Sequence, residues 1–129
     1  MKDKRTDIRG LKMTNSRRKG KVGELEFCRL ARKHGYDAYR SQQYSGDREK
    51  GDPDVKGLPG LHPEIKRRER LDLDGWLAQA RSESSGCIPI VAHRRNNEKW
   101  KITMDADDFF EIYREWEAGQ ALEGEHNEY

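Results

Sequence analysis

Cysteine and long apolar runs are scarce in this chain, and each scarcity excludes a class of protein. Cys28 and Cys87 are too few for a disulfide framework, and they lack the spacing of a zinc site. No apolar run approaches the roughly eighteen residues of a membrane span, and no basic leader precedes an apolar stretch. The sequence therefore predicts neither a membrane segment nor a secretory signal. We expect an intracellular, cytoplasmic protein in a reducing compartment.

Hydrophobic residues make up only 33% of the 129 residues, whereas 39% are charged. This length accommodates one domain, and its core must be small. Three Trp, five Tyr and three Phe still supply large apolar side chains, which argues against a wholly disordered chain.

The net charge of +2 conceals a strong difference between the two ends of the chain. Residues 1–21 carry nine Lys and Arg against two Asp, a net charge of +7. Residues 105–129 carry one Arg against nine acidic residues, a net charge of −8. A basic segment that leads into a basic body is typical of nucleic-acid-binding proteins. A solvated tail is the commoner explanation of any single charge run, so the pattern supports nucleic-acid binding without establishing it.

Periodicity and turn residues divide the chain into three segments. Residues 1–15 are predicted to form a flexible basic arm, residues 16–118 a folded domain, and residues 119–129 an acidic, frayed tail. Helices are expected at 16–34, at 72–86 and from Asp105, the last with Phe109, Ile112, Tyr113 and Trp116 on one face. Strands are expected at 36–44, 53–56, 62–68, 88–93 and 100–103. The order αβββαββα predicts an α/β sandwich around a mixed β-sheet.

Glu24 is an acidic residue on an otherwise apolar helix face. Phe27, Cys28 and Ala31 follow it at the spacing of one face. A carboxylate in such surroundings is costly unless it is neutralised, paired or bound to a metal. A salt bridge with a nearby Arg and a role as metal ligand are both open, and Glu24 taken alone slightly favours the salt bridge.

Asp54, Glu64 and Lys66 form a second group of charged residues. Glu64 and Lys66 are separated by one residue in a predicted strand, so their side chains point to the same face. Asp54 follows Pro53 ten residues earlier, a spacing that permits a hairpin. Taken singly, Asp54 is an ordinary turn former and Glu64 with Lys66 a chance charge pair. A hairpin would bring both carboxylates opposite Glu24, where three carboxylates repel one another unless Mg²⁺ or Mn²⁺ binds them.

Pro53-Asp54 followed by Glu64-Ile65-Lys66 resembles the motif of the PD-(D/E)XK nuclease superfamily. Within it, the archaeal and phage Holliday-junction resolvases are most similar to this chain. The basic segment 17–20 before Glu24, Arg40-Ser41 and Ser45-Gly46 extend the resemblance, which covers about residues 16–117. It implies a restriction-endonuclease-like fold. Two glycines and two prolines between Asp54 and Glu64 predict short or irregular strand pairing there.

The resemblance also implies roles for individual residues. Asp54, Glu64 and the backbone carbonyl of Ile65 would hold Mg²⁺, for which Mn²⁺ can substitute, with Glu24 completing or supporting the site. Lys66 would orient or deprotonate the attacking water and stabilise charge on the scissile phosphate. Ser45 would lie near the scissile strand. DNA contacts are expected from Arg17, Arg18, Lys19, Arg40, Ser41, Arg67, Arg68, Arg70 and Gln79.

The arginines at the end of the predicted strand, Gln79 and His62 are less specific than the other residues of the site. Arg67, Arg68 and Arg70 could equally form a solvated strand end. Gln79 begins a Gln-x-x-x-Tyr pattern of some superfamily branches, which fails here at Glu83. His62, two residues before Glu64, could line the site but is more simply an ordinary strand histidine.

These observations together predict a Holliday-junction resolvase that makes symmetric nicks in branched DNA. Symmetric nicking of a four-way junction requires two active sites related by a two-fold axis, so we expect a C2 homodimer. One alternative is another PD-(D/E)XK nuclease that cuts duplex DNA, in the manner of a restriction or repair nicking enzyme. Another is a non-catalytic nucleic-acid-binding module on the same fold. The intact set of Asp54, Glu64 and Lys66 weighs against the second alternative.

Overall fold

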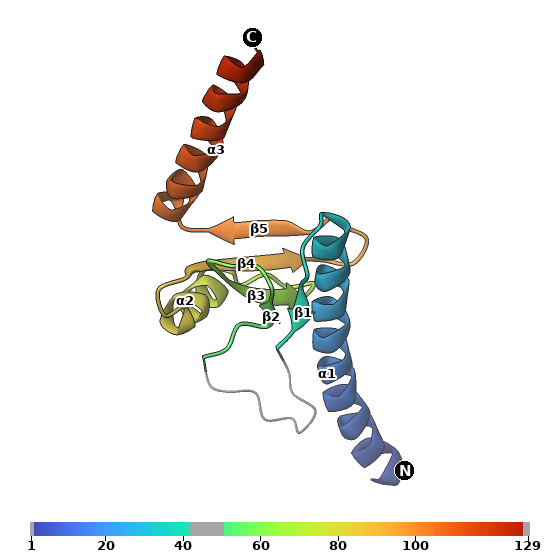
Figure 1. Ribbon diagram of the computed structural model, residues 1–129. Coiled ribbons are helices and arrows are strands. Elements are labelled where there is room, and N and C mark those ends of the chain that lie inside the picture. Colours follow the sequence, from blue (N-terminus) through green and yellow to red (C-terminus); the bar gives the residue numbers. More distant parts are fainter. Residues whose placement is uncertain (1, 42–50, 128–129) are drawn as a thin grey trace.

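The structure, a computed structural model, describes residues 2–41 and 51–127, with side chains from residue 18 to residue 124. Its elements are α1 (Lys2–Lys33), β1 (Tyr39–Arg40), β2 (Val55–Lys56), β3 (Leu61–Arg67), α2 (Leu73–Glu83), β4 (Ile88–Arg94), β5 (Lys101–Met104) and α3 (Ala106–Asn127) (Figure 1). Helices and strands follow one another in the order that the sequence predicts. The chain is an α/β protein.

The strands of the described residues fall into two sheets. The larger is mixed, with β4 parallel to β3 and antiparallel to β5, and the smaller pairs β1 with β2 in antiparallel fashion. Between the two sheets, the backbone N–H of Asp54 donates to the carbonyl of Pro63 at 3.0 Å. Pro63 has no N–H to return this bond, so an antiparallel ladder between β2 and β3 cannot continue through it. The mixed sheet is confirmed, but it holds fewer strands than were expected.

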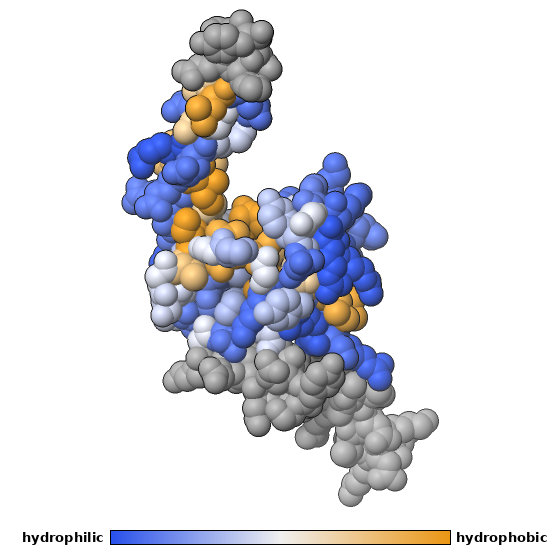
Figure 2. Space-filling view, in the orientation of Figure 1, coloured by the Kyte–Doolittle hydropathy of each residue, from blue (hydrophilic) through white to orange (hydrophobic). Residues whose placement is uncertain are grey.

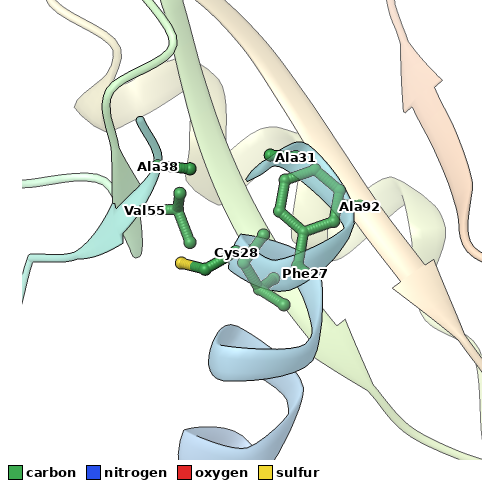
Figure 3. Close-up of a cluster of buried hydrophobic side chains, with 7 residues drawn as sticks. Phe27, Cys28, Ala31, Ala38, Val55 and Ala92 are labelled. Atoms are coloured by element: carbon green, nitrogen blue, oxygen red, sulfur yellow. The ribbon is translucent and has the colours of Figure 1, made fainter. Parts of the chain in front are cut away.

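Helices cover both faces of the mixed sheet. Ala92 of β4 belongs to a buried cluster with Phe27, Cys28 and Ala31 of α1 (Figure 3). Its neighbour Val91 packs instead with α2. Adjacent strand residues point to opposite faces, so α1 and α2 lie on opposite sides of the sheet, as a sandwich requires.

The C-terminal end of α1 and the N-terminal end of α2 lie where the sequence predicts them. Gly35 has a φ of +95°, and its backbone N–H donates to the carbonyl of Arg32 at 2.9 Å, which ends α1 where it was expected to end. Asp72 caps α2, and its side chain accepts a hydrogen bond from the N–H of Gly75.

The predicted start of the first helix and the predicted end of the last helix were wrong. α1 begins at Lys2 and not near Ser16, and α3 continues to Asn127, through most of the predicted frayed tail. Residues 2–15 contain no proline and several strong helix formers, so a helix anchored further along can extend through them. The N-terminal and C-terminal ends lie at opposite ends of the molecule (Figure 1). No helix in the described residues combines the length and apolar character needed to cross a bilayer.

α3 projects from the body and leaves its apolar side chains exposed (Figures 1 and 2). Trp116 is 57% exposed and Phe109 46% exposed, and the rings of Phe109 and Tyr113 stack with centroids 6.0 Å apart. The predicted face is therefore present, but it is not covered by the described residues of the same chain.

Candidate active site

Asp54 and Glu64 are brought side by side by the turn before β2. The N–H of Ile65 donates to Asp54 Oδ2 at 2.8 Å, and the N–H of Asp54 donates to Pro63, so Asp54 is held to β3 from both its backbone and its side chain. Ser41 fixes the turn, since its hydroxyl donates to the carbonyl of Pro53. Asp54 is 7% exposed and Glu64 2% exposed. Two carboxyl groups are thus positioned together in a largely dry environment.

A cavity of about 410 Å³ opens over this pair. Its lining includes most of the catalytic and metal-binding residues expected from the sequence, and it comprises Gly20, Glu24, Gly51, Asp54, Glu64, Ile65, Lys66, Arg67, Arg68, Gln79 and Glu83. α1, the β2 turn, β3 and α2 all contribute to it. Four segments that are distant in the sequence therefore converge at one place.

The electrostatics of the cavity centre on Glu64. Burial, together with the neighbouring carboxyls of Asp54 and Glu83, raises the pKa of this carboxyl to about 8. Such a group holds a proton at neutral pH unless a cation takes its place. A set of crowded carboxylate oxygens is the donor set that Mg²⁺ and Mn²⁺ bind, so the residues present fit a divalent ion.

Glu24 lines the same cavity and also forms the salt bridge that its sequence context allowed. Arg40 Nε lies 2.8 Å from Glu24 Oε1, and each side chain is 17% exposed. Both interpretations of Glu24 therefore have a structural basis: the carboxylate is paired, and it faces the cavity. Arg40, expected to contact DNA, is engaged with Glu24.

The other expected DNA contacts divide by exposure. Arg68 and Arg70, which follow β3, are exposed, as is Arg18 on α1; Lys19 is half-buried and Gln79 is exposed at the cavity. Arg67 is half-buried and pairs with Glu26 at 3.1 Å. Ser41 is 1% exposed and holds the Pro53 turn, so its side chain has no surface for DNA. Ser45 and the side chain of Arg17 lie outside the described residues.

Glu83 was not among the expected site residues, and His62 was expected to be an ordinary strand histidine, although its position allowed it to line the site. His62 Nε2 lies 3.3 Å from Glu64 Oε1 and 3.9 Å from Glu83 Oε2. The sequence did contain a signal for Glu83: it follows Gln79 by four residues, so both share one face of α2. His62 precedes Glu64 by two residues in β3, so both side chains lie on the same face of the strand.

No protein-family model matches this chain, and its sequence matches no curated protein. The functional interpretation consequently rests on the cavity and on the residues that line it.

Proposed function

We propose that this protein is a metal-dependent DNA endonuclease with a restriction-endonuclease-like fold, and that it resolves Holliday junctions. One observation carries the proposal: Asp54, Glu64, Ile65 and Lys66 line a single cavity together with Glu24. The order of helices and strands and the mixed sheet covered on both faces support it.

The cavity provides the groups that hydrolysis of a phosphodiester requires. Asp54, Glu64 and the carbonyl of Ile65 would hold Mg²⁺ or Mn²⁺, and Glu24 would support the site. When bound, such an ion lowers the pKa of a coordinated water and offsets charge on the phosphate.

Lys66 supplies the positive side chain next to the carboxylates. It follows Glu64 by two residues on β3, so both side chains project toward the cavity. There its ammonium group would orient the attacking water and stabilise charge that develops on the phosphate, or, as the neutral amine, Lys66 would take a proton from that water. Arg68 at the cavity and the exposed Arg70 beyond it would contact flanking phosphates, which position DNA without reading its sequence.

Cleavage of a four-way junction by paired nicks requires two such cavities in one assembly. We propose a C2 homodimer for this reason. The exposed apolar face of α3 supports it, because Phe109, Ile112, Tyr113 and Trp116 are each 42% exposed or more in the single chain.

The catalytic part of the proposal is tested by removing one charge at a time. Asp54→Asn and Glu64→Gln should each lower the rate of Mg²⁺-dependent DNA cleavage at least about a thousandfold, while DNA binding remains nearly unchanged. Asp52→Asn and Glu69→Gln, which alter carboxylates that do not line the cavity, are the matched controls. Wild-type rates of nicking by Asp54→Asn or Glu64→Gln would remove the proposed metal site.

A further inference from the structure

A second group of ligand atoms adjoins the Asp54–Glu64 pair. His62 of β3, Glu64 and Glu83 of α2 each offer one ligand atom, and the three atoms lie within 4.8 Å of one another. Atoms bound to the same cation at about 2.0–2.2 Å lie about 3–4 Å apart, which is the range of the two His62 distances, 3.3 and 3.9 Å. The ligand atoms of the three side chains are thus already about as far apart as atoms that bind one metal ion.

Two of the three side chains in this cluster are buried, which distinguishes it from a group of acidic residues on the surface. His62 is 3% exposed and Glu64 2% exposed, so the imidazole and one carboxyl are enclosed, whereas the Glu83 side chain is 28% exposed and opens to the cavity. Enclosed carboxylates are costly unless they are protonated, paired or bound to a metal. Here the alternatives are a proton held by Glu64 within the cluster and a metal ion that takes its place.

We propose that His62, Glu64 and Glu83 form a second cation position, which shares Glu64 with the Asp54 position and binds Mn²⁺ in preference to Mg²⁺. The preference follows from the ligands. Mg²⁺ is held by oxygen ligands and retains its waters, whereas imidazole nitrogen is a ligand for transition-metal ions. The Asp54 position offers oxygen atoms, and the His62 position offers nitrogen together with oxygen. The inference rests on the proposed function in that Glu64 also serves the catalytic ion.

The test counts Mn²⁺ ions bound by the full-length chain, from the paramagnetic resonance signal of the free ion during a titration. The wild-type protein should bind two Mn²⁺ per chain. Glu83→Gln and His62→Gln should each lower the affinity of the His62 position for Mn²⁺ at least about tenfold and leave the affinity of the Asp54 position unchanged. Asp54→Asn should lower the affinity of the Asp54 position and leave the affinity of the His62 position unchanged. His34→Gln and Glu115→Gln, at exposed residues, are matched controls that should still bind two ions.

The structural role of His62 is separated from ligation by the choice of variants. A glutamine at the buried His62 can weaken folding, so a thermal melt accompanies each titration, and Glu83→Gln at a half-buried residue provides the independent measurement. A single Mn²⁺ per wild-type chain, or two Mn²⁺ bound with wild-type affinities by folded Glu83→Gln, would overturn the inference in favour of a cluster that holds a proton in place of the second ion. If the protein cuts DNA with Mg²⁺ but binds one Mn²⁺, this inference alone fails. If it binds two Mn²⁺ but cuts no DNA, the proposed function fails and the second position stands.

Discussion

At the scale of single residues, the raised pKa of Glu64 makes the stability of the metal-free protein depend on pH. The carboxyl is protonated up to about pH 8 in the folded state, whereas in the unfolded chain it has an ordinary pKa near 4.5. Between these values the folded state binds more protons than the unfolded state, so the free energy of unfolding falls as pH rises.

We therefore expect urea unfolding in the presence of a chelator to show decreasing stability from pH 5 to pH 8, and Glu64→Gln to flatten much of this slope. Mn²⁺ should also reduce it, since a bound cation replaces the proton. Glu69→Gln, at an exposed carboxyl, is the control and should keep the wild-type slope. A stability that is level or rising across this window in the wild-type protein would contradict the assigned environment of Glu64.

The approach of Asp54 to Glu64 was predictable because a turn and an alternating strand determine side-chain direction locally. Other residues depended on contacts that no local pattern contains. The Glu24–Arg40 pair joins α1 to β1, and Glu26 joins Arg67 of β3 to Arg94 of β4. Glu83 was missed since it departs from the Gln-x-x-x-Tyr pattern, although a carboxylate at that position changes what the cavity can bind.

At the scale of elements, the small β1–β2 sheet depends on one glycine at the end of β2. Gly57 has a φ of +96°, and a Cβ atom there would lie 2.1 Å from the carbonyl oxygen of Asp37. Gly60 in the same turn has a φ of +88° with no atom within 4 Å of such a Cβ. Both positions thus have a backbone conformation that disfavours a side chain, but only Gly57 has the close approach.

Gly60→Ala should lower the free energy of unfolding by about 1–2 kcal/mol, from the left-handed backbone alone. Gly57→Ala should lower it by at least ~3 kcal/mol, because the backbone of Asp37 must also move. Chemical unfolding of both variants in parallel measures the difference. Equal losses would mean that the contact between Gly57 and the start of β1 does not hold this sheet in place.

The elements in the middle of the chain were predictable because their ends carry strong signals, such as Gly35 and Asp72. The short pairing of Val55–Lys56 agrees with the glycines and prolines that follow it, whereas residues 36–41, the described part of the first predicted strand, are paired only at Tyr39–Arg40. Pro63 limits pairing between β2 and β3, and its effect depends on which side of the strand faces the neighbour. That side is determined by tertiary structure and not by the local sequence.

At the scale of the whole molecule, the acidic helix α3 and the N-terminal end of α1, where the sequence is basic, lie at opposite ends (Figure 1). Residues 105–129 carry a net charge of −8, so this helix is unsuited to contact phosphates. Its exposed aromatic residues are suited to contact another protein surface. This division places the proposed DNA surface at the cavity and the proposed dimer surface on α3.

Light scattering of the purified protein should give the mass of a dimer, and Trp116→Glu should shift it to that of a monomer, since the introduced charge would have to be buried in the interface. Glu115→Gln, at the neighbouring exposed residue, should remain dimeric. A monomeric wild-type protein, or a dimer that tolerates Trp116→Glu, would show that this face of α3 does not join two copies.

The most direct test of the central claim is cleavage of a labelled four-way junction beside a linear duplex and a single strand of the same sequence. The reactions are run with and without Mg²⁺ across several salt concentrations, with Glu64→Gln as the inactive control. Phosphate contacts make affinity for every DNA form fall with salt, so a preference for the junction must come from two cavities engaging separate arms at once. The proposal predicts Mg²⁺-dependent, paired and symmetric nicks in the junction, in the presence of excess duplex. Equal cleavage of junction and duplex at all salt concentrations would contradict the resolvase assignment and favour a general nuclease, and absence of cleavage in every reaction would contradict the enzyme itself.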